Sequence, residues 1–217
     1  MDKQGALYFW LDLVATLAMV VALAMFIRFF IISPFHVFGP SMCNTLNELD
    51  GECVNDYGEL IIVNELLYQK VLGASIGEPQ TGDVVVFTPP GGDGSYYIKR
   101  IIGTPGDTLK IENGSAFMKV DGKFIELDES AYLSESNLNN TPSNNPGVEY
   151  TVPEDSYFVM GDNRNRSTDS RSCFSQNSDG PCDGSNENAY ITRGSIRGKA
   201  SIVFWPPVSL RLIDDLH

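Results

Sequence analysis

Histidine is scarce in this sequence of 217 residues, which contains only His36 and His217. A Ser-His-Asp triad would have to use one of these two side chains as its base. His36 lies in an extended-looking segment five residues before Ser41, and His217 is the last residue, where chains usually fray. A serine hydroxyl is a poor nucleophile until a base takes its proton, so lysine is the better candidate for that role.

Basic residues are also few, with 15 Lys and Arg against 28 Asp and Glu, and the net charge is -13. A nucleic-acid-binding surface needs clustered positive charge, so this balance predicts no nucleic-acid partner. Cysteine occurs four times without any C-x-x-C spacing. With so few histidines, this spacing predicts no zinc site, and we expect neither a metal nor a cofactor.

The cysteines fall into two pairs that are local in sequence, Cys43 with Cys53 and Cys173 with Cys182. In an oxidising compartment, each pair could form a disulfide. Four cysteines allow three different connectivities, and buried free thiols remain the alternative for either pair.

Residues 6–32 are almost wholly apolar, with Asp12 and Arg28 as their only charged side chains. The uncharged part would rise only ~22 Å as a helix, but the flanking turns extend it to the roughly 30 Å of a bilayer core. Asp12 and Arg28 can reach toward the two interfaces. A cleaved signal peptide is the alternative, although no small-residue cleavage site follows the run. We predict one transmembrane helix in residues 1–33, and the cysteine pairs favour an extracytoplasmic position for the remainder.

Short β-branched runs follow the anchor and predict a mainly β fold. The expected strands lie at 60–63, 84–87, 96–102, 157–160 and 202–205, and a helical turn is expected near 65–71. The turn dipeptides Asn113-Gly114 and Asp121-Gly122 predict a small meander over 108–126. Residues 133–147 have little to bury and are expected to form a mobile loop. The β core therefore comprises 34–107 and 151–217, with an inserted subdomain and mobile loop at 108–150 and an insertion at 172–190.

Lys99 lies in the middle of an expected strand beside Tyr97, Ile98 and Ile101, which is an unusual place for a cation. Burial disfavours a charged amine and can lower a lysine pKa by several units from about 10.4. The neutral amine could then act as a general base. The alternative is a strand lysine that points to solvent.

Residues 161–171 follow an apolar strand and are rich in arginines and short polar side chains. Alone, this segment would be a surface loop with Asx-type turns. Asp169 could form a fixed ion pair with Arg100 or Arg171, and Ser167 could hydrogen-bond an amine.

Four motifs together resemble those of the bacterial type I signal peptidases, which are membrane-anchored Ser–Lys proteases that remove signal peptides from exported preproteins. The motifs are Gly39-Pro-Ser-Met-Cys-Asn-Thr-Leu46, Gly82-Asp-Val-Val-Val-Phe87, Tyr97-Ile-Lys-Arg-Ile-Ile-Gly-Thr-Pro-Gly-Asp107 and Gly161-Asp-Asn-Arg-x-x-Ser-x-Asp-Ser-Arg171. The resemblance extends from the anchor to Trp205-Pro206 and thins at 108–150 and 172–190. It implies an antiparallel β catalytic domain of signal-peptidase type in the bacterial cytoplasmic (inner) membrane, on the extracytoplasmic face.

The resemblance also implies roles for individual residues. Ser41 corresponds to the nucleophile and Lys99 to the base that later protonates the leaving amine. Ser167 corresponds to the hydroxyl that orients the lysine, while Asp169, Arg100 and Arg171 correspond to a bracing ion-pair network. The Ser41 backbone N–H would supply one oxyanion donor. In some members a serine two residues earlier supplies another donor, but this chain has Gly39 there.

The substrates implied by the resemblance are preprotein signal peptides with an Ala-x-Ala pattern before the cut, and the implied second partner is the lipid bilayer. Large apolar walls would admit small side chains and exclude bulky ones. The expected wall residues are Met42, Leu46, Tyr97 and Ile98 for the first pocket, and Phe35, Val37 and Ile98 for the third. An extended substrate could add as a strand along Phe35–Val37 and Tyr96–Ile98. Ordinary core packing is the alternative for these residues.

Two departures from the family pattern lie beside Ser41. Asn44 stands where the family usually has proline, so the turn is expected to be looser, and Cys43 is a poor alternative nucleophile because it lacks a base. The segment 172–190 is expected to form a disulfide-closed loop near the cleft rim.

Two other classes of protein share some of these features. Self-cleaving repressor-type Ser–Lys peptidases are soluble and carry a DNA-binding module, whereas this chain has an anchor and an acidic balance. A catalytically silent membrane-anchored β-domain could act as a binding or scaffold module, but it would not need Ser41, Lys99, Ser167 and Asp169 together.

Overall fold

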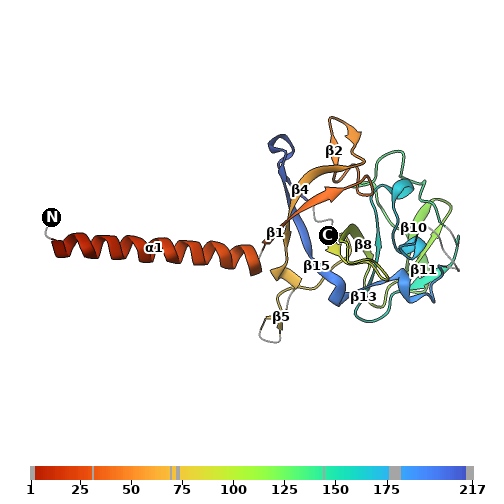
Figure 1. Cartoon of the computed structure of the whole chain (residues 1–217). Helices are drawn as coiled ribbons and strands as arrows, with labels where there is room; N and C mark the ends of the chain where they lie inside the picture. Colours follow the sequence, from red (N-terminus) through yellow and green to blue (C-terminus); the bar gives the residue numbers. More distant parts are fainter. Residues whose placement is uncertain are drawn as a thin grey trace.

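A single long helix projects from a β-rich body (Figure 1). The computed structural model describes residues 3–30, 32–68, 70–71, 74–143, 145–175 and 182–213. Helix α1 spans Lys3–Phe30 and lies directly before the first strand. Within it, the stretch Leu7–Met25 has a mean hydropathy of 2.1 and is not buried against the rest of the chain. A helix that is apolar on all sides and covers nothing in its own fold is typical of a membrane span.

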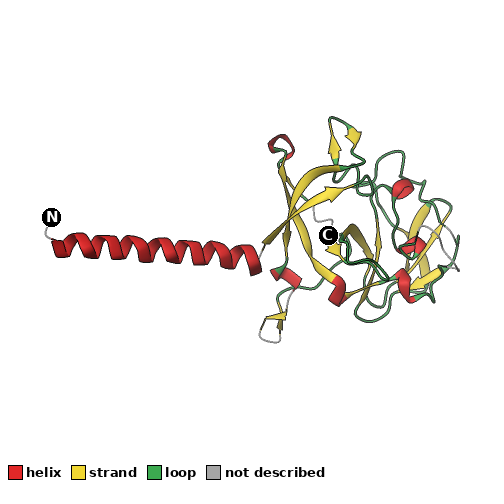
Figure 2. Cartoon of the chain, in the orientation of Figure 1, coloured by secondary structure: helices red, strands yellow, loops and turns green. Residues whose placement is uncertain are grey.

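The main sheet is antiparallel and carries eight strands (Figure 2). Its order is β1-β4-β15-β7-β8-β13-β14, and β16 pairs with β15 outside this path. The strands are β1 (Ile32–Phe38), β4 (Tyr57–Asn64), β7 (Val84–Phe87), β8 (Tyr97–Gly103), β13 (Ser156–Met160), β14 (Ile191–Thr192), β15 (Ile196–Trp205) and β16 (Arg211–Leu212). Register shifts along β15 mark bulges, which increase the local twist and curl the sheet.

The five strand predictions are confirmed, because 60–63, 84–87, 96–102, 157–160 and 202–205 lie in or directly beside β4, β7, β8, β13 and β15. All four residues of β7 are buried, with Val84 and Val86 in one core cluster and Val85 and Phe87 in another. This burial on both faces explains the continuous apolar run. Strand β1 was not predicted because it contains Pro34; proline is tolerated there since β1 forms an edge of the sheet.

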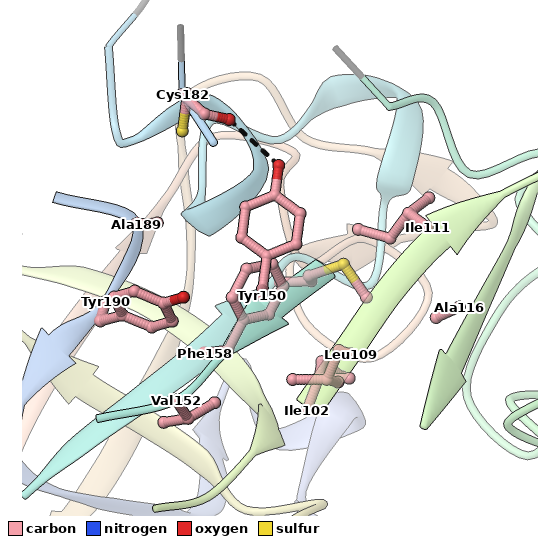
Figure 3. Packing of buried hydrophobic residues seen from close by; sticks show 11 residues of the cluster. Ile102, Leu109, Ile111, Ala116, Tyr150, Val152, Phe158, Cys182, Ala189 and Tyr190 are labelled. Atoms are coloured by element: carbon pink, nitrogen blue, oxygen red, sulfur yellow. Dashed lines mark hydrogen bonds between the residues drawn. The ribbon is translucent and has the colours of Figure 1, made fainter. Parts of the chain in front are cut away.

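A second antiparallel sheet forms the inserted subdomain, with the order β11-β10-β9-β12. Its strands are β9 (Thr108–Glu112), β10 (Ser115–Val120), β11 (Lys123–Glu126) and β12 (Glu149–Thr151). Asn113-Gly114 and Asp121-Gly122 have positive φ angles and close the two hairpins as predicted. Figure 3 shows how the two sheets join through apolar packing, with the ring of Tyr150 near Leu109 and Phe158 and its hydroxyl donating to Cys182 O.

The prediction that residues 133–147 have little to bury is wrong for the part that the structure describes. Leu133, Asn137 and Thr141 are all less than a tenth exposed. Thr141 accepts a hydrogen bond from Arg164, and Asn137 accepts one from the Asn165 backbone. Polar partners from a distant loop therefore compensate for the low apolar content, and the mobility of this segment stays a prediction.

Several short elements complete the fold. Two small hairpins are formed by β2 (Glu48–Leu49) with β3 (Glu52–Cys53) and by β5 (Lys70–Val71) with β6 (Ala74–Ser75). The single 3-10 turns are η1 (Leu66–Tyr68), η2 (Arg164–Arg166), η3 (Ser170–Ser172), η4 (Glu187–Ala189), η5 (Arg193–Ser195) and η6 (Pro207–Ser209). The expected helical turn near 65–71 is η1. In the insertion at 172–190, residues 176–181 lie outside the described residues.

Candidate active site

Ser41 lies on the loop of residues 39–47, between β1 and the β2–β3 hairpin. Gly39 begins the loop with a φ of +78°, a conformation that favours glycine. Hydrogen bonds from Cys43 N to Pro40 O (3.0 Å) and from Leu46 N to Met42 O (2.7 Å) wind the loop into tight turns. Met42 and Leu46 are fully buried, whereas Ser41 is partly exposed. The two apolar side chains therefore anchor the loop in the core and leave the serine at its rim.

Lys99 reaches this serine from β8, where it lies opposite Val85 of β7. Its Nζ donates to Ser41 Oγ at 2.7 Å and to Ile98 O at 2.7 Å. Only 3% of the lysine is exposed, so the solvent-facing alternative is wrong. Burial lowers the pKa of Lys99 to about 8, although the nearby Asp169 and Asp162 carboxylates oppose this shift. An amine with this pKa is partly neutral near pH 8 and can accept a proton from Ser41.

The ion pairs around this lysine decide between the two predicted partners of Asp169. Asp169 pairs with Arg171 at 2.8 Å, whereas Arg100 pairs with Asp162 at 2.7 Å, and all four side chains are buried. The predicted pairing of Asp169 with Arg171 is therefore confirmed, whereas the alternative pairing with Arg100 is wrong because Arg100 binds Asp162. Asp162 was missed as a site residue, although its place directly after Gly161 in a loop that follows a buried strand was a usable signal.

Asp169 stays ionised because of the donors around it. Burial favours the neutral acid, but the charge of Arg171 and its hydrogen bonds hold the pKa of Asp169 below its ordinary value. Gly161 N also donates to this carboxylate at 3.0 Å. The charge of Asp169 is therefore a fixed part of the environment of Lys99.

Ser167 is packed beside the site but does not make the predicted hydrogen bond. Its Oγ is buried and makes no hydrogen bond to Lys99 among the described contacts, while it helps to hold the pKa of the nearby Asp169 carboxyl low. It lies over Gly161, where an added Cβ would collide with both Ser167 Oγ and the Ser41 carbonyl. Asn163 N donates to that same Ser41 carbonyl at 3.1 Å. Close packing at Gly161, rather than a side-chain bond to Lys99, joins the two loops here.

A further buried ion pair was not predicted, because its two residues are 35 positions apart in the sequence. Arg164 binds Glu129 at 2.5 Å. The ring of Tyr132 lies between this ion pair and Arg100, and the Arg100 guanidinium is 4.4 Å from the centre of that ring. The sequence contained no local signal for this contact. It ties the segment between β11 and β12 to the loop at 161–171.

The predicted pocket residues separate into two groups. Val37, Met42 and Leu46 are buried in one apolar cluster, against which Phe35 and Ile98 pack as partly buried members. Tyr97 packs instead against the cluster on the other face of the sheet, beside Phe87 and Phe174. Its ring centroid nevertheless lies 5.6 Å from Lys99 Nζ. Five of the six residues therefore share one wall, while their function as pockets stays a prediction.

His36 does not provide the base in this arrangement. Its ring is exposed, stacks near Tyr57 and has Nε2 3.3 Å from Gly58 O. The hydrogen bond at Ser41 Oγ comes from Lys99. His217 lies outside the described residues.

Comparison with known proteins shows the family of this chain. The family model described as "Signal peptidase, peptidase S26" matches residues 10–205. This chain belongs to that family. It is accordingly a serine endopeptidase, and the family match runs from within helix α1 through both loops of the site to the end of β15.

Individual relatives resemble this S26 peptidase over most of its length. "Signal peptidase I" of Bacillus licheniformis is 32% identical over 98% of this chain and 96% of its own length. "Probable signal peptidase I-2" of Synechocystis is 30% identical over 95% of this chain and 78% of its own. A solved structure, "Crystal structure of a signal peptidase I" from Enterococcus faecalis V583, is 27% identical over 58% of this chain and all of its own, with a TM-score of 0.39.

Two disulfides lie beside the site of this peptidase. Cys43 is bonded to Cys53, and Cys173 to Cys182, so the structure selects the two sequence-local pairs. The first disulfide joins the Ser41 loop to strand β3, and a bonded Cys43 has no thiol to serve as an alternative nucleophile. The second brackets part of the insertion at 172–190 and packs against the core of the inserted sheet.

Proposed function

We propose that this peptidase removes N-terminal signal peptides from exported preproteins, with Ser41 as the nucleophile and Lys99 as the general base. The observation that carries the proposal is the 2.7 Å hydrogen bond between Lys99 Nζ and Ser41 Oγ, formed by a buried lysine. Burial supplies the neutral amine that a serine–lysine mechanism requires, and proximity removes the need for a third group to relay the proton.

The reaction would proceed through an acyl-enzyme. Neutral Lys99 takes the Ser41 proton as Oγ attacks the scissile carbonyl, and the Ser41 backbone N–H donates to the developing oxyanion. The protonated lysine then gives this proton to the leaving amine as the peptide bond breaks. Lys99 next activates a water, which hydrolyses the ester and restores Ser41.

The surrounding polar groups would hold the lysine in place during these steps. Arg171 holds the pKa of Asp169 below its ordinary value, so this carboxylate does not take the proton of Lys99, and Asp162 is paired with Arg100. We retain Ser167 as the group that orients the Lys99 amine during the reaction. Its Oγ is buried over Gly161, where the loop at 161–171 meets the Ser41 carbonyl.

Substrate selection would depend on the shape of the apolar wall. Met42 and Leu46 are fully buried and fixed, so they would limit the depth of the first pocket, while Phe35, Val37 and Ile98 would border the third. Tyr97 would flank the first pocket through its position beside Lys99. Such shallow pockets admit Ala and reject larger side chains, which gives cleavage after an Ala-x-Ala pattern.

The sheet offers two edges to an extended substrate. Strand β1 ends the main sheet and pairs with β4 alone in the described sheet order. Strand β8 pairs with β13 from Arg100 to Gly103 along one of its edges. The segment Tyr97–Ile98 lies before this pairing and is hydrogen-bonded to β7 along the opposite edge. Its β13-side edge is therefore the one offered to a substrate. A substrate strand adding at these edges would pass Ser41 with alternate side chains directed at the apolar wall.

The lipid bilayer is the second proposed partner. Helix α1 would cross it once and place the catalytic body on the extracytoplasmic face of the bacterial cytoplasmic membrane. Large apolar side chains of the β15–β16 connection and of β16 support a position beside the membrane, because Val208 is 92% exposed, Leu212 70% and Leu210 67%. Protease added outside intact spheroplasts should degrade the body; protection there would reverse the topology.

The function is tested by cleavage of a model preprotein with an Ala-x-Ala site, using the full chain in detergent. Wild type is compared with Ser41→Ala and Lys99→Met, and the thermal unfolding of each variant is measured. The proposal expects cleavage after the second Ala by wild type and none by either folded variant. Undiminished cleavage by Lys99→Met would place the base elsewhere, and an inactive wild type would favour a silent binding module.

A further inference from the structure

Asn47 is a wholly buried amide at the base of the loop that carries Ser41. Its side chain has no exposed surface, and its backbone has a φ of +64°, a left-handed conformation that asparagine tolerates better than most residues. A buried polar side chain of this kind costs stability unless its donors and acceptors are used.

The Asn47 amide is used completely. Its Nδ2 donates to Gly39 O at 3.0 Å, Asp56 O at 3.1 Å and Val54 O at 3.2 Å. Its Oδ1 accepts from Glu59 N at 2.9 Å. Gly39 opens the loop that Asn47 closes, so one side chain fixes both ends of the segment containing Ser41 and joins them to the β2–β3 hairpin and to β4.

The neighbouring residue Gly58 keeps a space for this amide. A Cβ at Gly58 would collide with Asn47 Oδ1, although the φ angle of Gly58 itself does not demand glycine. The absence of a side chain at this position is therefore explained by the close approach of Asn47.

A buried carboxylate and an arginine hold the same loop from its other side. Glu59 accepts from Asn47 N at 2.7 Å and is bound by Arg211 at 2.6 and 2.9 Å. Arg211 also donates to Thr45 O at 2.8 Å, four residues after Ser41. The C-terminal strand β16 thus reaches the loop through Arg211.

We propose that Asn47 is a positioning residue for the reaction: by fixing the Gly39 carbonyl, it sets Ser41 Oγ within hydrogen-bond distance of Lys99, and Arg211 supports it through Thr45. This inference rests on the proposed Ser–Lys function. Asn47 touches no reacting atom itself. It acts through the loop backbone, whose displacement by about 1 Å can cost on the order of a hundredfold in rate.

The decisive variant is Asn47→Asp, which keeps the shape and the acceptor but removes the donor facing three carbonyls. We expect kcat to fall roughly 10- to 100-fold while KM stays within about threefold, because the variant misplaces the nucleophile and leaves the apolar wall intact. The midpoint of the pH–rate profile should remain that of wild type, because Lys99 stays buried. A generally loosened fold would instead admit water to Lys99 and shift this midpoint upward.

Asn137→Asp is the matched control. Asn137 is 3% exposed, and its amide likewise both donates, to Ser134 Oγ at 2.9 Å, and accepts, from Asn165 N at 3.1 Å. It lies outside the Ser41 loop. We expect a comparable fall in Tm for both variants, with kcat close to wild type for Asn137→Asp.

Arg211 supplies a second pair of variants in case Asn47→Asp does not fold. The Arg211 side chain is 37% exposed, but its partner Glu59 is wholly buried, so thermal unfolding of each Arg211 variant is measured beside its kcat. Arg211→Gln should lower kcat, and Arg211→Lys, which retains the charge but loses the fork, should recover part of the loss.

The comparison separates this inference from the function on which it rests. Loss of kcat by Asn47→Asp, or by Arg211→Gln, with an unchanged pH midpoint and an active Asn137→Asp supports positioning. Wild-type kcat in Asn47→Asp, or equal losses in both asparagine variants, overturns it while wild type still cuts. A wild type that does not cut, or an active Ser41→Ala, instead overturns the Ser–Lys function itself.

Discussion

Arg100 and Asp162 form a buried ion pair, with Arg100 Nη2 2.7 Å from Asp162 Oδ2 and Nε 3.0 Å from Oδ1. Thr45 of the Ser41 loop donates to the same carboxylate. Asp162 therefore connects β8, which carries Lys99, with the nucleophile loop and the loop at 161–171. This contact makes it a support for the relative position of the two reacting groups.

Asp162→Asn should destabilise the fold strongly, because it leaves the Arg100 guanidinium buried without its counter-charge. Breaking such a pair from one side typically costs about 3–5 kcal/mol. Urea unfolding measures the loss. The control is Glu149→Gln, which removes a half-exposed pair with Lys119 and should cost under about 1 kcal/mol. Equal losses in the two variants would contradict the structural importance given to Asp162.

Activity should rise with pH up to about 8 and then level off. The base works as a neutral amine, and the pKa of Lys99 is lowered to about 8 by burial. Below that pH, kcat/KM should fall about tenfold for each unit of pH. Asp169 stays ionised over this range because its pKa is held low, so it does not shape the profile. A flat profile between pH 6 and 9, with chemistry rate-limiting, would exclude Lys99 as the base.

Lys99→Met should make the folded protein more stable at neutral pH, even as it abolishes activity. The pKa of Lys99 is 10.5 in the unfolded chain and about 8 in the folded protein. Below pH 8 the wild type therefore buries a charged amine, which lowers its free energy of unfolding. The expected difference is about 3 kcal/mol. Between pH 8 and 10.5 the unfolded state binds the extra proton, so wild-type stability rises with pH and the gap closes.

Denaturant unfolding of both proteins at pH 7 and pH 10 measures this gap. A difference that does not change with pH would mean that Lys99 has an ordinary pKa in the folded protein. The Lys99 amine would then be in closer contact with water in the folded protein than its burial indicates.

Gly161→Ala should impair activity by moving the Ser41 loop. An added Cβ would collide with the Ser41 carbonyl, which is backbone and cannot rotate away, and also with Ser167 Oγ. We expect a lower kcat together with a lower Tm. Gly194→Ala is the control, because nothing lies within 4 Å of the added Cβ there. If Gly161→Ala keeps the kcat of wild type, the loops at 41 and 161 can move apart without loss of activity.

Local patterns in the sequence predicted the secondary structure well. The β-branched runs of β4 and β7 and the turn dipeptides at 113–114 and 121–122 act over a few residues, and each was found where expected. Strand β1 was missed because proline and histidine hide its pattern, and only its place at the sheet edge makes Pro34 acceptable. The segment at 133–143 was misjudged because its buried polar groups find partners in a loop far away in sequence.

The sequence by itself determined the apolar helix and the strands, because hydrophobic periodicity and turn chemistry are local, and its four motifs carried the resemblance that points to Ser41 and Lys99. Tertiary structure alone decided that Asp162 and not Asp169 pairs with Arg100, that Arg164 binds Glu129, and that Asn47 holds the Ser41 loop. The physical reason is that a buried polar group must satisfy its charge and hydrogen bonds with whatever folding brings within about 3 Å, and residues far apart in the chain supply those partners.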